Sequence, residues 1–391
     1  MTRSIWLDVD GATPREKTRE QVDVAIVGGG IIGAGCAHFL AKRGLKSIVL
    51  EAGTVASGAS GRNGGFVLRG IQSYYNIAVK RYGRENARRV YAFTEENQTM
   101  LRQFLDGGNG KDAYEPCGSY LLACSLEELD ELAESADLMK QDGFTVDYLK
   151  EDPLDRDFYG ALFNSGDLAI NPVKVVRALL EECRTTVAEG ETVSRIQSDG
   201  NKLVVHATNK VVECDRVLLA INAYSPMFDS FFIDKITPAR GQILVTKPLR
   251  ERILDRLCYA NYGFEYFRQL SDNRLLVGGC RQNFSNDEMG YVDMVSKPVQ
   301  SALENCLKDR FPDVAGVRID YRFSGVMGFT ADGLPLVGEI KKLPGTFFAA
   351  GFNGHGLGYG LNMSRLLVDV ALDGLSPGIF NADRAPLAVA R

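Results

Sequence analysis

Apolar and polar positions near the start of the chain predict a strand, a helix and a second strand in succession. Residues 22–27 form a short apolar run, residues 31–43 carry apolar side chains at helical spacing, and residues 46–50 return to a strand pattern. Glycines separate these segments. A helix of this length can connect two parallel strands, so we expect a βαβ unit and a parallel sheet.

The rest of the chain interleaves helical and strand patterns without a linker. Helices are expected, from their apolar periodicity, over residues 84–105, 126–139, 172–183, 299–311 and 361–372. Asn171 and Pro172 suit the N-cap and the first turn of the third of these helices. Strands are expected, from short apolar or alternating runs, over residues 118–124, 192–196, 203–207, 211–214, 217–221, 243–246, 262–268, 275–278 and 347–350. This interleaving predicts domains that are discontinuous in sequence.

The composition narrows the class of protein. A chain of 391 residues corresponds to two or three domains at about 150 residues each. Its net charge of −5 gives no field that would hold a polyanion, so we expect no nucleic-acid partner. No apolar run approaches the roughly 20 residues that span a bilayer, so we expect no transmembrane segment.

The first residues and the cysteines bear on location. Residues 1–20 are polar apart from Ile5, Trp6 and Leu7, so we expect a surface strap and see no export signal. The eight cysteines form no C-x-x-C pair and no cluster with histidine. We therefore expect reduced thiols, no metal site and a cytoplasmic protein.

The first cluster of glycines carries a recognisable pattern. Gly28, Gly30 and Gly33 match G-x-G-x-x-G between the first strand and helix, and Glu51 closes the next strand. Such glycines permit a tight turn, the approach of a pyrophosphate to the helix N-terminus, and close packing of the helix on the sheet. Because an acid there suits a ribose diol, we expect a dinucleotide without a 2′-phosphate. A glycine-rich turn with no ligand is the alternative.

Two later glycine clusters bear on which dinucleotide binds. Residues 57–65 combine glycines with two hydroxyls, a guanidinium and an amide, which can serve the second part of a long cofactor. Residues 351–360 lie between a strand and the last helix, whose N-terminus can face a flavin. Both clusters favour FAD over NAD. A flexible surface loop and a tight strand-to-helix turn are the respective alternatives.

Further segments match one known family, at residues 166–167 with 171–172, 238–242, 266–268 and 325–338. Together with the glycine clusters, they make the chain resemble the FAD-dependent D-amino-acid oxidase superfamily, which includes glycine oxidase, sarcosine oxidase and gamma-glutamylputrescine oxidoreductase. The resemblance runs from the Trp6 segment to the C-terminal helix. It implies an α/β, two-domain fold, in which a glutathione-reductase-type, Rossmann-like FAD-binding domain is interleaved with an antiparallel-sheet substrate domain.

The resemblance also implies domain boundaries. The FAD-binding domain would comprise residues 1–83, 151–235 and 325–391, and the substrate-binding domain residues 84–150 and 236–324.

The resemblance further implies where FAD lies. Its pyrophosphate would meet the first glycine cluster, its adenine the backbone of Val193, and its flavin the second and third clusters. The implied FAD-binding residues are Gly28, Gly30, Ile32, Gly33, Glu51, Ala52, Ser60, Gly61, Arg62, Asn63, Gly64, Gly65, Val193, Gly325, Gly354, His355, Gly356 and Leu357.

Two positions depart from the family. Sarcosine oxidases tether their flavin through a cysteine whose place Gly325 takes here, so the resemblance implies non-covalent FAD. Members that oxidise amino acids bind the substrate carboxylate with an arginine at the position of Met327, and a thioether cannot replace a bidentate guanidinium. Simple α-amino acids are therefore disfavoured, unless Arg62, Arg69 or Arg268 binds the carboxylate instead.

One predicted strand supplies a candidate substrate wall. Tyr262, Phe264, Tyr266 and Arg268 alternate along it, so they would share a face, which the resemblance makes the roof of the substrate cavity. An ordinary core face is the alternative. For His355 we favour a flavin contact over a role as catalytic base. The full set of substrate-pocket candidates is Phe66, Tyr262, Tyr266, Arg268, Met327 and His355.

The resemblance implies an enzyme that oxidises the C–N bond of a primary or secondary amine, such as a polyamine conjugate or another N-substituted amine. A hydride would pass to flavin N5, the imine would be hydrolysed, and O2 or another acceptor would reoxidise the flavin. The alternatives are an FAD-dependent 2-hydroxy acid or D-amino acid dehydrogenase, a flavin-binding subunit of a complex, and a nicotinamide dehydrogenase.

Overall fold

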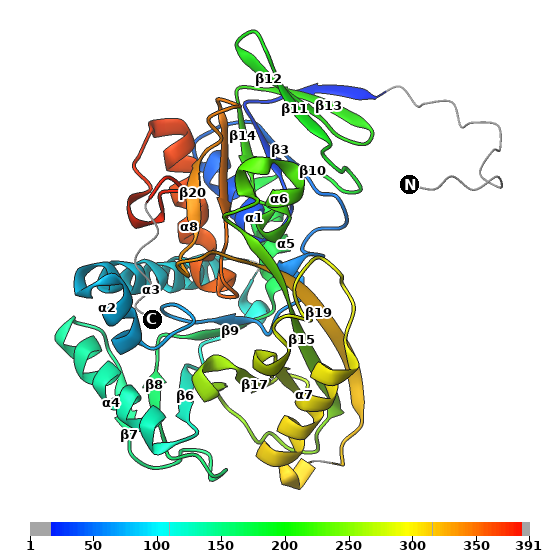
Figure 1. The fold of residues 1–391 in the computed structure, drawn as a ribbon. Coiled ribbons are helices and arrows are strands. Elements are labelled where there is room, and N and C mark those ends of the chain that lie inside the picture. The colour runs from blue at the N-terminus through cyan, green and yellow to red at the C-terminus, as the bar shows by residue number, and fades with distance from the viewer. Residues whose placement is uncertain (1–16, 109, 315, 385–391) are drawn as a thin grey trace.

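The chain folds into two parts that it crosses between several times (Figure 1). A computed structural model describes residues 17–108, 110–314 and 316–384. The strap expected around Ile5, Trp6 and Leu7 lies outside these residues. One part holds a parallel sheet with its helices, and the other holds a larger sheet. No helix among the described residues is both long enough and apolar enough to cross a membrane.

A six-stranded sheet forms the core of the first part, and all its strands are parallel except β20. Helices α1 and α8 pack against each other and against this sheet, and α5 packs on α1. Every residue of β2 is buried, which is why this strand is a continuous apolar run. In spatial order the strands are β10 (Thr186–Ala188), β3 (Ser47–Leu50), β2 (Val24–Val27), β14 (Arg216–Leu219), β21 (Thr346–Ala350) and β20 (Leu336–Glu339). The helices are α1 (Ile31–Lys42), α5 (Pro172–Cys183) and α8 (Gly356–Asp373).

An eight-stranded sheet forms the second part, and its pairs are antiparallel except β16 with β6. Helix α7 packs on β15 and β18, and α4 packs on β6, β7 and β8. In spatial order the strands are β19 (Ile319–Phe329), β15 (Thr237–Pro248), β18 (Arg274–Gly279), β17 (Glu265–Gln269), β16 (Leu257–Ala260), β6 (Ser119–Ala123), β8 (Gly160–Asn164) and β7 (Asp147–Leu149). The helices are α4 (Leu126–Gln141) and α7 (Lys297–Arg310).

Two smaller sheets and three further helices complete the described fold. Helix α3 packs along α8 and α2, and α2 also contacts α4, so these helices join the two parts. The four-stranded sheet comprises β1 (Thr18–Gln21), β13 (Lys210–Cys214), β12 (Lys202–His206) and β11 (Arg195–Asp199). The three-stranded sheet comprises β4 (Phe66–Val67), β9 (Leu168–Ile170) and β5 (Tyr114–Glu115). The remaining helices are α2 (Tyr75–Tyr82), α3 (Arg84–Gly107) and α6 (Ser225–Phe228).

The βαβ unit and the α/β fold are confirmed, and so is the start of α5. The Asn171 side chain accepts a hydrogen bond from the Lys174 N–H at 3.1 Å, as the N-cap prediction requires. The strand expected over residues 192–196 was placed too early, since β11 begins at Arg195. The last helix was placed too late, because α8 begins at Gly356 and continues through an irregular Gly360.

Candidate functional site

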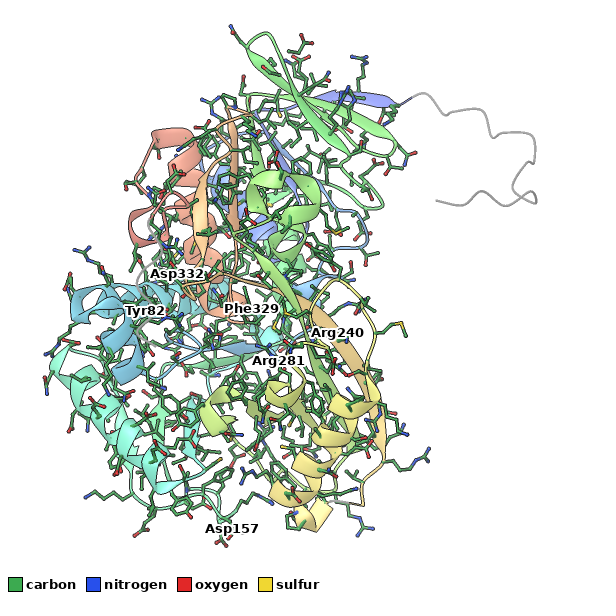
Figure 2. All side chains as sticks on the ribbon, viewed as in Figure 1. Tyr82, Asp157, Arg240, Arg281, Phe329 and Asp332 are labelled. Carbon is green, nitrogen blue, oxygen red and sulfur yellow. The ribbon has the colours of Figure 1, made fainter. Side chains whose placement is uncertain are left out.

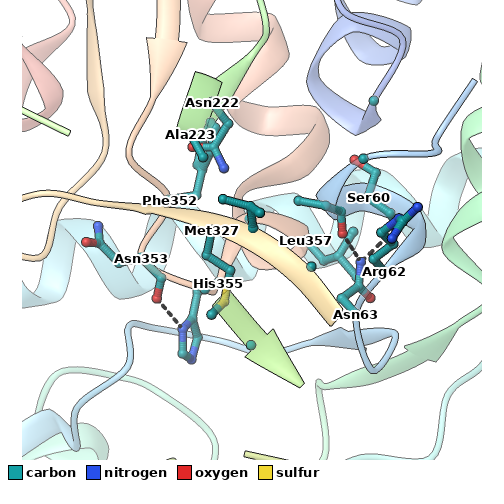
Figure 3. Close-up of a pocket in the computed structure, with 18 of the residues that line it drawn as sticks. Ser60, Arg62, Asn63, Asn222, Ala223, Met327, Phe352, Asn353, His355 and Leu357 are labelled. Atoms are coloured by element: carbon teal, nitrogen blue, oxygen red, sulfur yellow. Dashed lines mark hydrogen bonds between the residues drawn. The ribbon is translucent and has the colours of Figure 1, made fainter. Parts of the chain in front are cut away.

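A cavity of about 1150 Å³ (Figure 3) is lined by residues at the carboxyl ends of β2, β3 and β14 and by residues of β15, β17 and β19 in the large sheet. Ligands of open parallel sheets bind at this edge, outside the ends of the strands. The cavity is therefore the candidate site, and both sheets contribute residues to it.

The first glycine cluster leaves no room for side chains at one end of the cavity. Gly28 has a φ of +105°, and a Cβ there would lie 2.7 Å from the Ala220 carbonyl oxygen. A Cβ on Gly33 would lie 1.9 Å from the Gly28 carbonyl oxygen. Only glycine fits either position, so this turn brings the N-terminus of α1 to the cavity, where backbone N–H groups favour an anion.

Glu51 is held at the same end by two backbone donors. The Gly29 N–H donates to its Oε2 at 2.7 Å, and the Gly53 N–H donates to its Oε1 at 2.8 Å. Ser60 lies beside it, and its Oγ accepts a hydrogen bond from the Ile31 N–H at 2.9 Å. Val193 lines the cavity nearby. The arrangement offers a carboxylate, a hydroxyl and a helix N-terminus to an adenosine pyrophosphate.

Hydrogen bonds and one ion pair hold residues 57–65 in place. The Asn63 side chain donates to the carbonyls of Ala59 and Ser60 and accepts from the Gly65 N–H (Figure 3). Arg62 forms an ion pair with Asp293. These bonds fix a stretch of backbone along the middle of the cavity.

The third glycine cluster brings the N-terminus of α8 to the cavity. His355 is the N-cap residue, and its Nδ1 lies 3.4 Å from the Asn353 carbonyl oxygen (Figure 3). Burial lowers the pKa of His355 below its ordinary value, so the ring is neutral at pH 7. The helix N-terminus at this place suits a ligand that gains negative charge.

Aromatic rings form the opposite wall. Tyr259 and Tyr266 stack with centroids 5.5 Å apart, and the edge of Phe66 meets both rings, at 5.4 and 5.6 Å. Gly278 makes the space for this packing, because a Cβ there would lie 2.3 Å from the Tyr266 ring. Met327 extends the apolar lining, with its sulfur near Gly354.

The expected alternation on one strand face is wrong for Tyr262 and Phe264, whereas Tyr266 and Arg268 do lie two residues apart on one strand. Strand β17 begins only at Glu265, and Tyr262 occupies a left-handed turn with φ of 54°. Its N–H donates to the buried Glu128 carboxylate at 2.8 Å. This contact, made with a residue distant in sequence, outweighs the strand pattern, and Tyr262 reaches the cavity from the turn.

The three arginines expected as replacements for the missing carboxylate binder are all engaged elsewhere. Arg268 donates to the carbonyls of Gly64, Gly65 and Ile170 and does not line the cavity. Arg69 is buried outside the cavity, where it binds Glu95, Thr145 and Asn164. Arg62 lines the cavity but forms an ion pair with Asp293.

The cavity brings together most of the residues that the sequence singled out. Those that line it are Gly28, Gly30, Ile32, Glu51, Ala52, Ser60, Arg62, Asn63, Gly64, Phe66, Val193, Tyr262, Tyr266, Gly325, Met327, Gly354, His355, Gly356 and Leu357. Five do not line it: three glycines that are packed against neighbouring backbone, and the arginines Arg69 and Arg268. These glycines are Gly33, Gly61 and Gly65.

Sequence reasoning missed several lining residues. Asn222 follows β14, so the rule that ligands bind beyond the ends of parallel strands would have found it. Tyr74, Tyr259, Arg281 and Phe329 carry no comparable signal, because they meet only through tertiary structure.

The fold and the cavity together define a dinucleotide-binding α/β protein. Residues 23–370 match the DAO family, described as FAD dependent oxidoreductase. The chain belongs to this family, and it is an FAD-dependent oxidoreductase, as the sequence resemblance implied.

Individual relatives share most of their length with the chain. It is 28% identical to Probable oxidoreductase OrdL of Haemophilus influenzae, over 90% of this chain and 83% of that protein. It is 27% identical to gamma-glutamylputrescine oxidoreductase of Escherichia coli, over 86% of this chain and 80% of that protein. The structure of glycine oxidase from Geobacillus kaustophilus matches the fold with a TM-score of 0.77 at 23% identity, covering 94% of this chain and 99% of that one.

Proposed function

We propose that this oxidoreductase oxidises the C–N bond of a primary or secondary amine, with an N-substituted amine as the preferred kind. The observation that carries the proposal is the aromatic wall of Phe66, Tyr259 and Tyr266 opposite the N-terminus of α8. Aromatic rings exclude water, which favours the neutral form of an amine, the form that can lose a hydride. The relative that acts on gamma-glutamylputrescine supports this substrate class.

The residues present fit FAD. The glycine turn that a Cβ would fill, the N-terminus of α1 and Glu51 would hold the adenosine pyrophosphate, with Val193 at the adenine. Residues 60–65 and 354–357 would border the flavin. When bound, FAD supplies the acceptor for the hydride that leaves the carbon beside the amine nitrogen.

The chain's own residues position the substrate for this step. The tyrosine and phenylalanine rings would hold the C–H bond towards the flavin and exclude water. The N-terminus of α8 would stabilise the negative charge that accompanies reduction. Water then hydrolyses the imine to a carbonyl compound and an amine or ammonia, and O2 or another acceptor takes the two electrons.

We also propose that the FAD is non-covalent. A Cβ at Gly325 would lie 2.5 Å from the Arg62 carbonyl oxygen, so a cysteine at this position would require the backbone to move. Acid precipitation should therefore release all of the flavin into the supernatant. Flavin that stays with the precipitate would contradict the proposal.

The domain division and the location are further parts of the proposal. Strand β8 pairs with β6 and β7 in the large sheet, which favours a boundary after Asn164 rather than at 151. Likewise, β19 pairs with β15 as far as Phe329, which favours a boundary after Phe329 rather than at 325.

None of the eight cysteines, all within the described residues, forms a disulfide, which supports a cytoplasmic location.

The test is an anaerobic visible spectrum of the purified protein, titrated with polyamine conjugates, N-methyl amines, α-amino acids and 2-hydroxy acids. Bleaching of the flavin by N-substituted amines is the expected result. Bleaching by 2-hydroxy acids but by no amine would overturn the proposed reaction and favour a hydroxy-acid dehydrogenase. Admission of air after bleaching then reports whether O2 accepts the electrons.

A further inference from the structure

One cation in the cavity has no counter-charge among the described residues. The charged side chains of the lining are Glu51, Arg62, Glu191 and Arg281. Glu51 accepts from two backbone N–H groups, and Arg62 pairs with Asp293. Glu191 accepts from the Asn209 N–H. The guanidinium of Arg281 makes no hydrogen bond and no ion pair within the described residues, and it rests 4.8 Å from the centre of the Phe329 ring (Figure 2).

The surroundings of Arg281 make this charge costly. Burial lowers its pKa, although a guanidinium stays protonated at neutral pH. The titratable groups that face it are the hydroxyls of Tyr259 and Tyr266, whose pKa values burial raises, and Glu288. Glu288 is already bound by Arg240 at 2.7 Å. The Phe329 ring offsets part of this cost, and an anion that enters the cavity would supply the missing counter-charge.

The position of Arg281 separates this charge from the place of Met327. Met327 and Phe329 lie two residues apart on one face of β19 and both line the cavity. Positions two residues apart on a strand are about 6.6 Å apart. The sulfur of Met327 lies near Gly354 at the N-terminus of α8, where no charged side chain lines the cavity within the described residues. Arg281 therefore rests against a side chain two residues along β19 from Met327.

We propose that Arg281 binds a carboxylate of the substrate that is separated from the reacting amine by several bonds. The substrate class is then an amino carboxylate whose nitrogen faces the α8 end while its carboxylate lies against Arg281. This inference rests on the proposed function, because it assigns the two ends of one substrate to the same cavity.

The chemistry favours a carboxylate over a phosphate group. A single guanidinium forms two parallel hydrogen bonds to a carboxylate and neutralises its one charge. A phosphate monoester brings close to two negative charges at neutral pH, and no second cation lines this end of the cavity among the described residues. The pyrophosphate of FAD would lie at the N-terminus of α1, where Gly28 and Gly30 line the cavity.

The experiment compares matched amines on the flavin-loaded protein. The probes are 4-(methylamino)butanoate, N-methylpropylamine and N-methylglycine, titrated anaerobically to give a Kd and a rate of flavin reduction for each. The variants are Arg281→Met, Arg281→Lys and the surface control Arg322→Met, whose arginine pairs with Glu304. The flavin content of every variant is measured first.

The expected result is a selective loss. In the parent, 4-(methylamino)butanoate should bind more tightly than both other amines. R281M should raise the Kd of 4-(methylamino)butanoate about 10- to 100-fold, which corresponds to the loss of a charge-assisted hydrogen bond. The Kd of N-methylpropylamine should stay within about twofold of the parent value. The Kd of 4-(methylamino)butanoate for R281K should lie between those of the parent and R281M, because an ammonium keeps the positive charge but cannot form the two parallel hydrogen bonds of a guanidinium. R322M should match the parent.

Two results would overturn the proposal. One is a parent enzyme that does not distinguish 4-(methylamino)butanoate from N-methylpropylamine, or that prefers N-methylglycine. The other is an R281M variant that weakens all three amines equally or loses its flavin, which would assign Arg281 to the cofactor.

A binding measurement keeps this inference separate from the proposed function. Butanoate, which has no amine to oxidise, should shift the flavin spectrum of the parent and of R322M but not of R281M. If no amine reduces the flavin while butanoate still binds through Arg281, the amine oxidation has failed and the carboxylate contact stands. If amines reduce the flavin and butanoate leaves the parent spectrum unchanged, the carboxylate contact has failed alone.

Discussion

The rings of Tyr74 and Tyr262 stack with their centroids 5.4 Å apart, and one carboxylate holds both residues. The Tyr74 hydroxyl and the Tyr262 N–H donate to the same oxygen of Glu128, and the Cys124 N–H donates to the other at 2.7 Å. Glu128 is only 1% exposed. This buried carboxylate fixes the turn that carries Tyr262 into the cavity.

Replacing Glu128 with alanine should therefore destabilise the protein and loosen the cavity wall. Three donors would lose their acceptor, and each buried donor left unsatisfied costs about 1–3 kcal/mol. We expect the free energy of unfolding, measured by urea denaturation, to fall by about 3 kcal/mol or more, and the KM for the amine to rise. The control is Glu127→Gln, an exposed neighbour on α4. A stable E128A protein with parental KM would show that this carboxylate does not set the turn.

Gly33→Ala should abolish FAD binding. Its Cβ would lie 1.9 Å from the Gly28 carbonyl oxygen, so the turn must open and the N-terminus of α1 must move. The ratio of flavin to protein absorbance after purification should fall by at least tenfold. Gly107→Ala is the matched control, because a Cβ there meets nothing within 4 Å. Equal flavin content in the two variants would contradict the assignment of this turn to FAD.

Local sequence signals predicted the glycine turn at the end of the cavity where we propose that FAD binds. The glycine pattern between a strand and a helix leaves few conformations open, since Gly28 and Gly33 sit where a Cβ would meet backbone. The N-cap at Asn171 was likewise predictable, because its side chain binds a donor only three residues away.

The part of the cavity that we propose for the substrate could not be predicted in the same way. Tyr262 looks like a strand residue, but a bond from its backbone to Glu128, 134 residues away, holds it in a left-handed turn. Arg281 follows a strand and faces Phe329 from another. Such pairs depend on which strands become neighbours, which periodicity does not encode. The apparent candidate Arg268 serves the backbone instead.

His38 should make the protein less stable in acid. It is buried in α1 between the rings of Phe39 and Phe104, and burial, with a smaller effect of Lys42, lowers its pKa from 6.5 to about 4. Glu182 lies 3.7 Å from Nδ1, but its carboxylate is half exposed and therefore screened. Because the unfolded chain binds the proton more tightly, the contribution of His38 is complete above pH 6.5 and is lost as the pH falls towards 4.

The measurement for His38 is urea denaturation of the parent and His38→Leu from pH 8 to pH 4. The parent should lose up to about 1.4 kcal/mol of unfolding free energy per pH unit below 6.5 relative to the variant. Between pH 7 and 8 the difference between the two proteins should be constant, which serves as the internal control. Parallel curves down to pH 4 would show that His38 keeps its ordinary pKa in the folded state.

Arg268→Met should affect the cofactor loop and leave carboxylate recognition intact. One nitrogen of Arg268 donates to the carbonyls of Gly64, Gly65 and Ile170, at 3.0 to 3.2 Å, and the side chain is 5% exposed. Removing it leaves these acceptors without their shared donor. We expect a loss of about 3 kcal/mol in the free energy of unfolding and a lower flavin content, because Gly64 lines the cavity.

The comparison with Arg281 makes this last prediction specific. In the fraction of R268M that retains flavin, the Kd for butanoate should stay within about twofold of the parent, whereas R281M should lose butanoate binding. Arg268 bonds to backbone and Arg281 faces the cavity, so the same substitution tests two different roles. If R268M kept full stability and flavin but lost butanoate, Arg268 would be the carboxylate receptor, and the side chain would have to leave its three carbonyls to reach the ligand.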